Sequence, residues 1–123
     1  MKLYDAPASN PMVVRLFVLE RGGISLDVET IDVMTMENRG LEYRKINPRG
    51  EVPALVLDNG FVLAEVTAIC EYLDEIAQGG ISLFGETPLE RAKHACGLDE
   101  WISKSHNLSY HGFLMIWALQ TSI

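Results

Sequence analysis

Pro53 stands directly before an apolar run, Ala54-Leu55-Val56-Leu57, whose length and composition predict a buried strand. Because proline has no backbone N–H, it is confined in sheets to edges, bulges and first strand positions. A turn segment, Asn47-Pro48-Arg49-Gly50, precedes this strand, and Asp58-Asn59-Gly60 follows it with the composition of a hairpin turn. The sequence therefore predicts a hairpin entered through a proline that either has a special structural role or is an ordinary trans turn residue.

The first eighty residues around this hairpin predict a small mixed sheet. Apolar residues recur at helical spacing from Met12 to Gly22 and from Ala64 to Ala77, and a glycine pair ends each segment. The polar segment 34–45 is expected to contribute one or two helical turns. The order β-α-β, connector, β-β-α predicts an α/β fold with helices packed on the sheet. Strands are expected at residues 2–4, 25–33, 54–57 and 61–63.

The character of the chain changes after residue 86. Thr87, Pro88 and Glu90 have the spacing of a capping box, which predicts the start of a helix. No later segment has a strand pattern, and the run from Phe113 to Leu119 is apolar on every side, as in a buried helix. We therefore expect one domain over residues 1–80 and part of an all-helical domain over residues 86–123.

The composition limits the function classes. Of the 123 residues, 48% are apolar, which suffices for a core without disulfides or structural metals. The net charge of −7 disfavours binding to nucleic acid or to an anionic membrane surface. No apolar run approaches the roughly 20 residues of a membrane span. With two cysteines, Cys70 and Cys96, no disulfide framework is expected, and the sequence predicts a soluble, cytoplasmic protein.

Four motifs then occur in a recognisable order. They are a strand and loop from Lys2 to Ser9 with a helix ending in Leu19-Glu20-Arg21-Gly22, the segment Asn47-Pro48-Arg49-Gly50-Glu51-Val52-Pro53-Ala54-Leu55, the hairpin tip Leu57-Asp58-Asn59-Gly60, and Glu65 with Ala68-Ile69 and Tyr72-Leu73. With these motifs the chain resembles the N-terminal half of a bacterial-type cytosolic glutathione transferase. The resemblance is dense over residues 1–78 and continues through residues 87–92. It implies a thioredoxin-like domain with a cis proline, followed by the first helices of the family's all-helical domain.

The resemblance implies a glutathione site around Pro53. Val52 would offer its backbone N–H and C=O to the cysteinyl part of glutathione, and the helix beginning near Glu65 would bind the glutamyl carboxylate through free N–H groups. Relatives place a serine after this acidic residue, but Val66 stands here, so the N–H remains and the hydroxyl is lost. We expect Thr67 to compensate in part for a hydrogen bond worth about 1.5–3 kcal/mol.

The resemblance also places a thiol-activating group in the loop before the first helix. Ser9 is expected to donate its hydroxyl to the glutathione sulfur and to lower the pKa of the thiol by roughly one to two units. Related bacterial sequences often have an extra residue after this serine, so Asn10 is the alternative donor. A third interpretation makes Ser9 a helix cap. Tyr4, although some relatives use a tyrosine, is expected to be packed within its strand.

The remaining polar side chains have no strong chemical pattern. Arg49 belongs to a basic cluster that either attracts the anionic tripeptide or is simply solvated; its other members are Arg39, Arg44 and Lys45. No metal site is expected, because the histidines lack the spacing of metal ligands. We expect buried free thiols at Cys70 and Cys96, solvated histidines at His94, His106 and His111, and an outer helix face that carries Glu71, Asp74 and Glu75.

The favoured function is that of a glutathione transferase, with glutathione as co-substrate and no cofactor. The resemblance implies that a small electrophile would bind in an apolar pocket shared with the helical domain. Two alternatives stay open: a glutathione-dependent disulfide reductase of the same fold, acting on a small disulfide substrate, and a non-catalytic or truncated binding module. Because residues 113–119 would form an exposed apolar patch in a monomer, we expect a homodimer, with or without exchange of the C-terminal helices.

Overall fold

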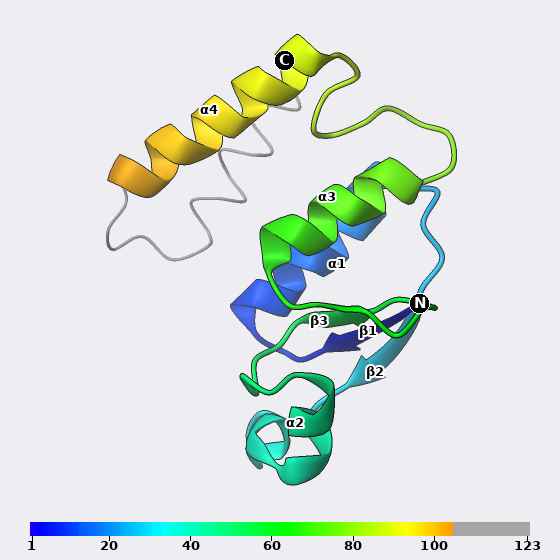
Figure 1. The fold of residues 1–123 in the computed structure, drawn as a ribbon, viewed down its shortest axis with the longest axis vertical. Coiled ribbons are helices and arrows are strands. Elements are labelled where there is room, and N and C mark those ends of the chain that lie inside the picture. The colour runs from blue at the N-terminus through cyan, green and yellow to red at the C-terminus, as the bar shows by residue number, and fades with distance from the viewer. Residues whose placement is uncertain (105–123) are drawn as a thin grey trace.

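The computed structural model describes the backbone of residues 1–104 and the side chains of residues 1–96. The element order confirms the expected α/β, thioredoxin-like fold (Figure 1). The elements are β1 (Lys2–Asp5), α1 (Ser9–Arg21), β2 (Asp27–Thr30), a 3-10 turn η1 (Glu37–Arg39), α2 (Leu41–Ile46), β3 (Ala54–Val56), β4 (Val62–Leu63), α3 (Val66–Ile76) and α4 (Pro88–Lys104).

The strands form a mixed sheet in the order β2-β1-β3-β4. β1 runs parallel to β2 and antiparallel to β3, and β3 runs antiparallel to β4. Tyr4 is paired with Ala54, and Leu55 with Leu63, so β1 and β4 both end beside the beginning of β3. Because α1 follows β1 and α3 follows β4 after short loops, both helices start at this same edge, on the left of the sheet in Figure 1. We call it the helix-start edge.

The core lies between the sheet and the layer formed by α1 and α3, which run side by side over one face (Figure 1). Apolar residues at helical spacing give each helix one buried stripe against the strands. Full burial of each large aliphatic or aromatic side chain contributes about 1.5–3 kcal/mol relative to exposure. The buried cluster consists of Leu3, Val13, Val14, Phe17, Leu55, Val66, Ile69, Cys70 and Leu73.

Helix α1 begins three positions before the expected Met12. Ala8 is the extended N-cap residue, and Ser9, Asn10 and Pro11 form the first turn. Proline is tolerated there because the first N–H groups of a helix have no intrahelical partner. The polar residues of this turn conceal the helix from a search for apolar periodicity, so the prediction that Ser9 lies in a loop is wrong.

The predicted hairpin turn and the predicted helical turns are confirmed. At the hairpin tip, the Leu57 N–H donates to the Phe61 carbonyl over 2.9 Å, and Gly60 has a φ of 86°. The positive φ explains why glycine occupies this turn position. The polar segment 34–45 contains η1 and most of α2, in agreement with one or two helical turns. β2, β3 and β4 are each shorter than expected, since their predicted end residues lie in the flanking loops.

The start of α4 is the predicted capping box. The Glu90 N–H donates to Thr87 Oγ1, and the Thr87 N–H donates to Glu90 Oε2, each over 3.2 Å. Within the described part of the chain, no helix is long and apolar enough to cross a membrane. The expected helices after residue 104, including the apolar run 113–119, lie outside the described residues.

Candidate functional site

The start of α1 presents two polar side chains without partners. Ser9 is exposed and Asn10 is half-buried, and neither side chain has a hydrogen bond to another described residue. Ala8, not Ser9, is the cap residue, so the interpretation of Ser9 as a helix cap is wrong. The hydroxyl and the carboxamide are therefore both available to a ligand at the positive end of the α1 dipole.

The loop that leads into α1 is held by a buried carboxylate. Asp5 is 4% exposed, and its Oδ2 accepts a hydrogen bond from Arg15 Nη1 over 2.6 Å. The same Arg15 nitrogen lies 3.5 Å from the Ala6 carbonyl oxygen. Sequence reasoning missed this pair, although the sequence shows an aspartate at the end of β1 and an arginine in the second turn of α1.

The turn before Pro53 is fixed by side chains that donate to its backbone. Tyr43 Oη and Asn47 Nδ2 both donate to the Glu51 carbonyl, over 2.7 Å and 2.9 Å. Asn38 Nδ2 donates to the Gly50 carbonyl over 2.8 Å. Burial raises the pKa of Tyr43 to about 12, so its hydroxyl stays a donor at neutral pH. The roles of Asn38 and Tyr43 were not predicted, because their partners are carbonyl groups that leave no sequence signature.

This turn presents the backbone of Val52. The peptide bond between Val52 and Pro53 is cis, and the Pro53 side chain is fully buried. Among the described residues, neither the N–H nor the C=O of Val52 has a hydrogen-bond partner. An extended peptide could therefore pair with this residue as a strand pairs with an edge.

The start of α3 is the third component of the helix-start edge. Glu65 is its N-cap and makes no side-chain cap bond, and the Ile69 N–H is the first to donate into the helix, to the Glu65 carbonyl. The N–H groups of Val66, Thr67 and Ala68 have no partner among the described residues. Free N–H groups at the positive end of a helix can donate to an anion, so this helix start is a candidate position for a carboxylate.

The side chains at this start divide between core and solvent. Val66 is 6% exposed and belongs to the core cluster, whereas Glu65 and Thr67 are exposed. The missing hydroxyl at position 66 is thus replaced by apolar packing. Thr67 is exposed in the first turn of α3, and its compensating role stays a prediction.

Arg49 connects the turn with the start of α3. Its Nη1 lies 2.8 Å from Glu65 Oε1, and its Nη2 lies 3.6 Å from Glu51 Oε2. The ion pair with Glu65 shows that the turn 47–50 and the α3 start are in contact. Because Arg49 already has two acidic neighbours, its attraction for a further anion is reduced. The other basic side chains also have local partners: Arg39 the Arg49 carbonyl, Arg44 the Pro48 carbonyl and Lys45 the Glu42 carboxylate.

Two predictions about buried and exposed groups are corrected. Cys70 is buried as expected, and burial raises the pKa of its thiol to about 12, but Cys96 is exposed. His94 is not a solvated histidine, because its ring lies 4.8 Å from the Phe84 ring and its Nε2 is buried without a hydrogen bond. This burial lowers the pKa of His94 below its ordinary 6.5, although the nearby Asp74 and Glu71 act in the opposite direction. His106 and His111 lie outside the described residues.

A third correction concerns Asp74. It was expected on an outer helix face, yet it is 4% exposed and accepts a hydrogen bond from Arg21 Nε over 2.8 Å. Tyr4 packs edge-to-face against Tyr43 with ring centroids 5.7 Å apart, as expected for a packed strand residue. Within the described residues, no group of three or more histidine, cysteine or acidic side chains could hold a metal ion.

Comparison with known proteins agrees with the fold. Residues 12–76 match the family model described as "Glutathione S-transferase, N-terminal domain". The chain is 39% identical over 93 residues to Glutathione S-transferase 2 of Saccharomyces cerevisiae, a match that covers 74% of this chain and 40% of the yeast protein. It is 37% identical over 95 residues to Protein LigF of Sphingobium sp., with coverage of 76% and 36%.

Solved structures give the same result. A glutathione S-transferase domain-containing protein from Marinobacter aquaeolei is 40% identical with a TM-score of 0.71, over 79% of this chain and 48% of that one. Gtt2 from Saccharomyces cerevisiae is 35% identical with a TM-score of 0.69, over 79% and 47%. The chain thus spans less than half the length of these relatives.

Proposed function

The chain belongs to the glutathione S-transferase family, and we propose that it binds glutathione at the helix-start edge and activates its thiol for attack on an electrophile. The observation that carries this proposal is the set of three free N–H groups at the start of α3, together with the unpaired backbone of Val52, which follows the turn that Arg49 joins to this helix start. The first group suits a carboxylate and the second suits an extended peptide, and glutathione contains both.

The glutamyl end of glutathione is assigned to the start of α3. Its carboxylate accepts hydrogen bonds from the N–H groups of Val66 and Thr67, with the Thr67 hydroxyl as an additional donor. The cysteinyl residue pairs with the N–H and C=O of Val52, which the buried Pro53 and the bonded Glu51 carbonyl hold in place. The ion pair between Arg49 and Glu65 joins the turn before Pro53 to the start of α3, which holds the two parts of this site together.

The thiol then points to the start of α1. A hydrogen bond from the Ser9 hydroxyl or the Asn10 carboxamide, together with the helix dipole, stabilises the thiolate and lowers the pKa of the thiol. The proton leaves to solvent. The sulfur forms a bond to the electrophilic carbon, and any leaving group departs with its electron pair. Glutathione is a co-substrate in this scheme, and no cofactor is needed.

The same proposal includes the electrophile site, the oligomeric state and the location of the protein. The electrophile binds between this domain and the helical region, which begins with α4 and which the chain contains in part. We propose a homodimer, with or without exchanged C-terminal helices, that works in the cytoplasm, where thiols stay reduced. The named transferase relatives favour this function over a disulfide reductase or a non-catalytic module.

Isothermal titration calorimetry with reduced glutathione tests the binding step. We expect the wild-type chain to bind with a micromolar to low-millimolar Kd, and Thr67→Ala to weaken binding about tenfold, the equivalent of about 1.4 kcal/mol. Glu75→Gln is the matched control, because Glu75 is exposed on the same helix but far from its start. No heat from a folded wild-type sample would refute the proposal, and light scattering of that sample tests the dimer.

The chemical step has its own test. Ser9→Ala and Asn10→Ala are compared with Ser25→Ala, an exposed serine outside the site. Loss of the thiol's hydrogen-bond donor is expected to raise the pKa of bound glutathione by roughly one to two units, measured from thiolate absorbance against pH. If the double variant Ser9→Ala/Asn10→Ala titrates like the wild type, the α1 start is not the activating group. Parallel assays with an aromatic halide and a mixed disulfide separate transferase from reductase activity.

A further inference from the structure

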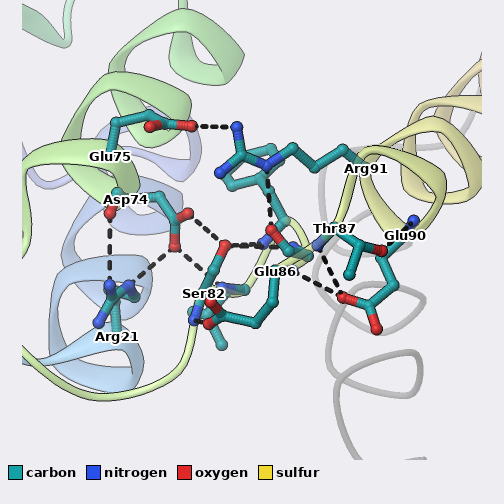
Figure 2. Close-up of polar contacts among 11 residues, drawn as sticks. Arg21, Asp74, Glu75, Ser82, Glu86, Thr87, Glu90 and Arg91 are labelled. Carbon is teal, nitrogen blue, oxygen red and sulfur yellow. Dashed lines mark hydrogen bonds and ion pairs between the residues drawn. The ribbon is translucent and has the colours of Figure 1, made fainter.

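A buried ion pair closes the ends of α1 and α3 that lie opposite the helix-start edge. Arg21 at the end of α1 and Asp74 near the end of α3 have side chains that are 6% and 3% exposed. Arg21 Nε donates to Asp74 Oδ1 over 2.8 Å (Figure 2). Arg21 Nη1 donates to the Gly79 carbonyl over 2.7 Å. The pair therefore joins both helices to the segment that follows α3.

The Asp74 carboxylate also organises that segment. Its Oδ1 accepts a second hydrogen bond from the Leu83 N–H over 2.9 Å, and its Oδ2 accepts one from the Ser82 hydroxyl. Ser82 Oγ in turn accepts from the N–H groups of Phe84 and Gly85, over 3.2 Å and 3.1 Å. One buried carboxylate thus satisfies, directly or through Ser82, three consecutive backbone N–H groups.

The organised segment leads directly into α4. Arg91, in the first turn of this helix, donates from Nε to the Gly85 carbonyl over 3.0 Å, and its Nη1 lies 2.6 Å from Glu75 Oε1 (Figure 2). Phe84 packs between Phe17 of the core and His94 of α4, with ring centroids 5.7 Å and 4.8 Å away. The direction in which α4 leaves the sheet domain is therefore tied to the conformation of residues 79–86.

The exposed and the buried ion pairs differ in how much they stabilise the placement of α4. The Arg91–Glu75 pair is half-exposed on both sides, and exposed pairs contribute little to stability. Removal of one partner from a buried pair leaves an uncompensated charge and is strongly destabilising. Asp74 and Ser82, rather than Glu75, are thus the groups on which the placement of α4 depends.

We propose that Asp74 is a positioning residue, which acts through Ser82 to fix residues 79–86 and thereby the placement of α4 on the sheet domain. Its catalytic consequence rests on the proposed function: α4 begins the helical side of the electrophile site, so loss of the contact affects the electrophile and not glutathione. The residues proposed to bind glutathione lie at the opposite ends of α1 and α3, so an effect on the electrophile can be separated from an effect on glutathione.

Hydrogen exchange measured by NMR on the full chain tests the contact itself. Ser82→Ala removes the acceptor for the Phe84 and Gly85 amides but leaves the Leu83 amide bonded to Asp74. We expect the first two amides to exchange at least about tenfold faster and the Leu83 amide to change less. Asp74→Ala is expected to accelerate all three, and Glu75→Gln, the matched control, none. Unchanged Phe84 and Gly85 exchange in Ser82→Ala would overturn the proposal, even if Asp74→Ala fails to fold.

Two further measurements report on the placement of α4 and on ligand binding. Both tryptophans of the chain, Trp101 and Trp117, come after residue 86 in the sequence, so their fluorescence anisotropy reports on residues that follow the segment and not on the sheet domain. We expect Ser82→Ala to lower the anisotropy and to raise KM for the electrophile, with the Kd for glutathione within about twofold of the wild type. Unchanged anisotropy would contradict the placement of α4. If the wild type binds no glutathione, the proposed function fails, while exchange and anisotropy still decide the role of Asp74.

Discussion

Val66→Ser is the substitution that separates the two tasks of position 66 most clearly. Val66 is 6% exposed within the core cluster, and its N–H is one of the three free groups at the start of α3. Serine removes two buried methyl groups, each worth about 0.5–1.5 kcal/mol in the core, and introduces a hydroxyl. We expect the free energy of unfolding to fall by about 2 kcal/mol.

The same hydroxyl is expected to improve binding. A hydrogen bond to a carboxylate contributes about 1.5–3 kcal/mol, which corresponds to a ten- to 150-fold lower Kd. Part of this gain is lost in ordering the weakened helix start, so we expect glutathione to bind about tenfold more tightly to Val66→Ser. Stability and affinity thus change in opposite directions.

Val66→Ala provides the matched control, because it removes the same methyl groups without adding a donor. Urea unfolding measures stability, and titration calorimetry with reduced glutathione measures affinity. Val66→Ala is expected to lose stability to a similar extent and to keep the wild-type Kd. If the serine and alanine variants bind glutathione equally, the side chain at position 66 does not reach the ligand, and the reasoning is wrong.

Three further predictions concern groups whose environment differs from the expected one. Cys96 is exposed, whereas burial raises the pKa of Cys70 to about 12, so Ellman's reagent should modify one thiol rapidly in the folded chain and none in Cys96→Ser. Burial lowers the pKa of His94 below 6.5, so in acid the unfolded state binds more protons than the folded state and the free energy of unfolding falls. Urea unfolding at about pH 7.5 and about pH 5.5 measures this change, and the free energy of unfolding should fall less in His94→Phe than in the wild type. Tyr43→Phe removes one of two donors to the Glu51 carbonyl and should lower the free energy of unfolding by about 0.5–1.5 kcal/mol in the same assay, and an unchanged value would show that the second donor suffices.

Features set by neighbouring residues could be predicted from the sequence. The hairpin at Asp58-Asn59-Gly60 and the capping box of Thr87 and Glu90 depend on contacts within a few positions, and both are present as expected. The order of strands and helices followed from the spacing of apolar residues. The start of α1 did not, because Ser9 and Asn10 occupy its first turn without contributing to that spacing.

Features set by distant residues could not be predicted in this way. Asp74 has the sequence context of an exposed helix face, and its partner Arg21 lies 53 positions away. The donors that fix the turn before Pro53 come from η1 and α2 and bond to carbonyl groups, which every residue has. The candidate site residues themselves were proposed from a family resemblance, and periodicity alone would have proposed none of them.

The two ends of the layer formed by α1 and α3 differ in their polar groups. At the ends opposite the helix-start edge, the buried Asp74 carboxylate has several partners. A negative charge near the C-terminus of a helix is unfavourable, because the helix dipole is negative there. Asp74 lies near the end of α3, so its position is stable only while Arg21, Ser82 and the Leu83 N–H compensate the charge. At the helix-start edge, by contrast, the N–H groups of α3 have no partner in the described chain. The buried charge near the end of α3 is thus compensated by side chains of the described chain, whereas the free N–H groups where the helix begins are the groups that the proposed function assigns to a ligand anion.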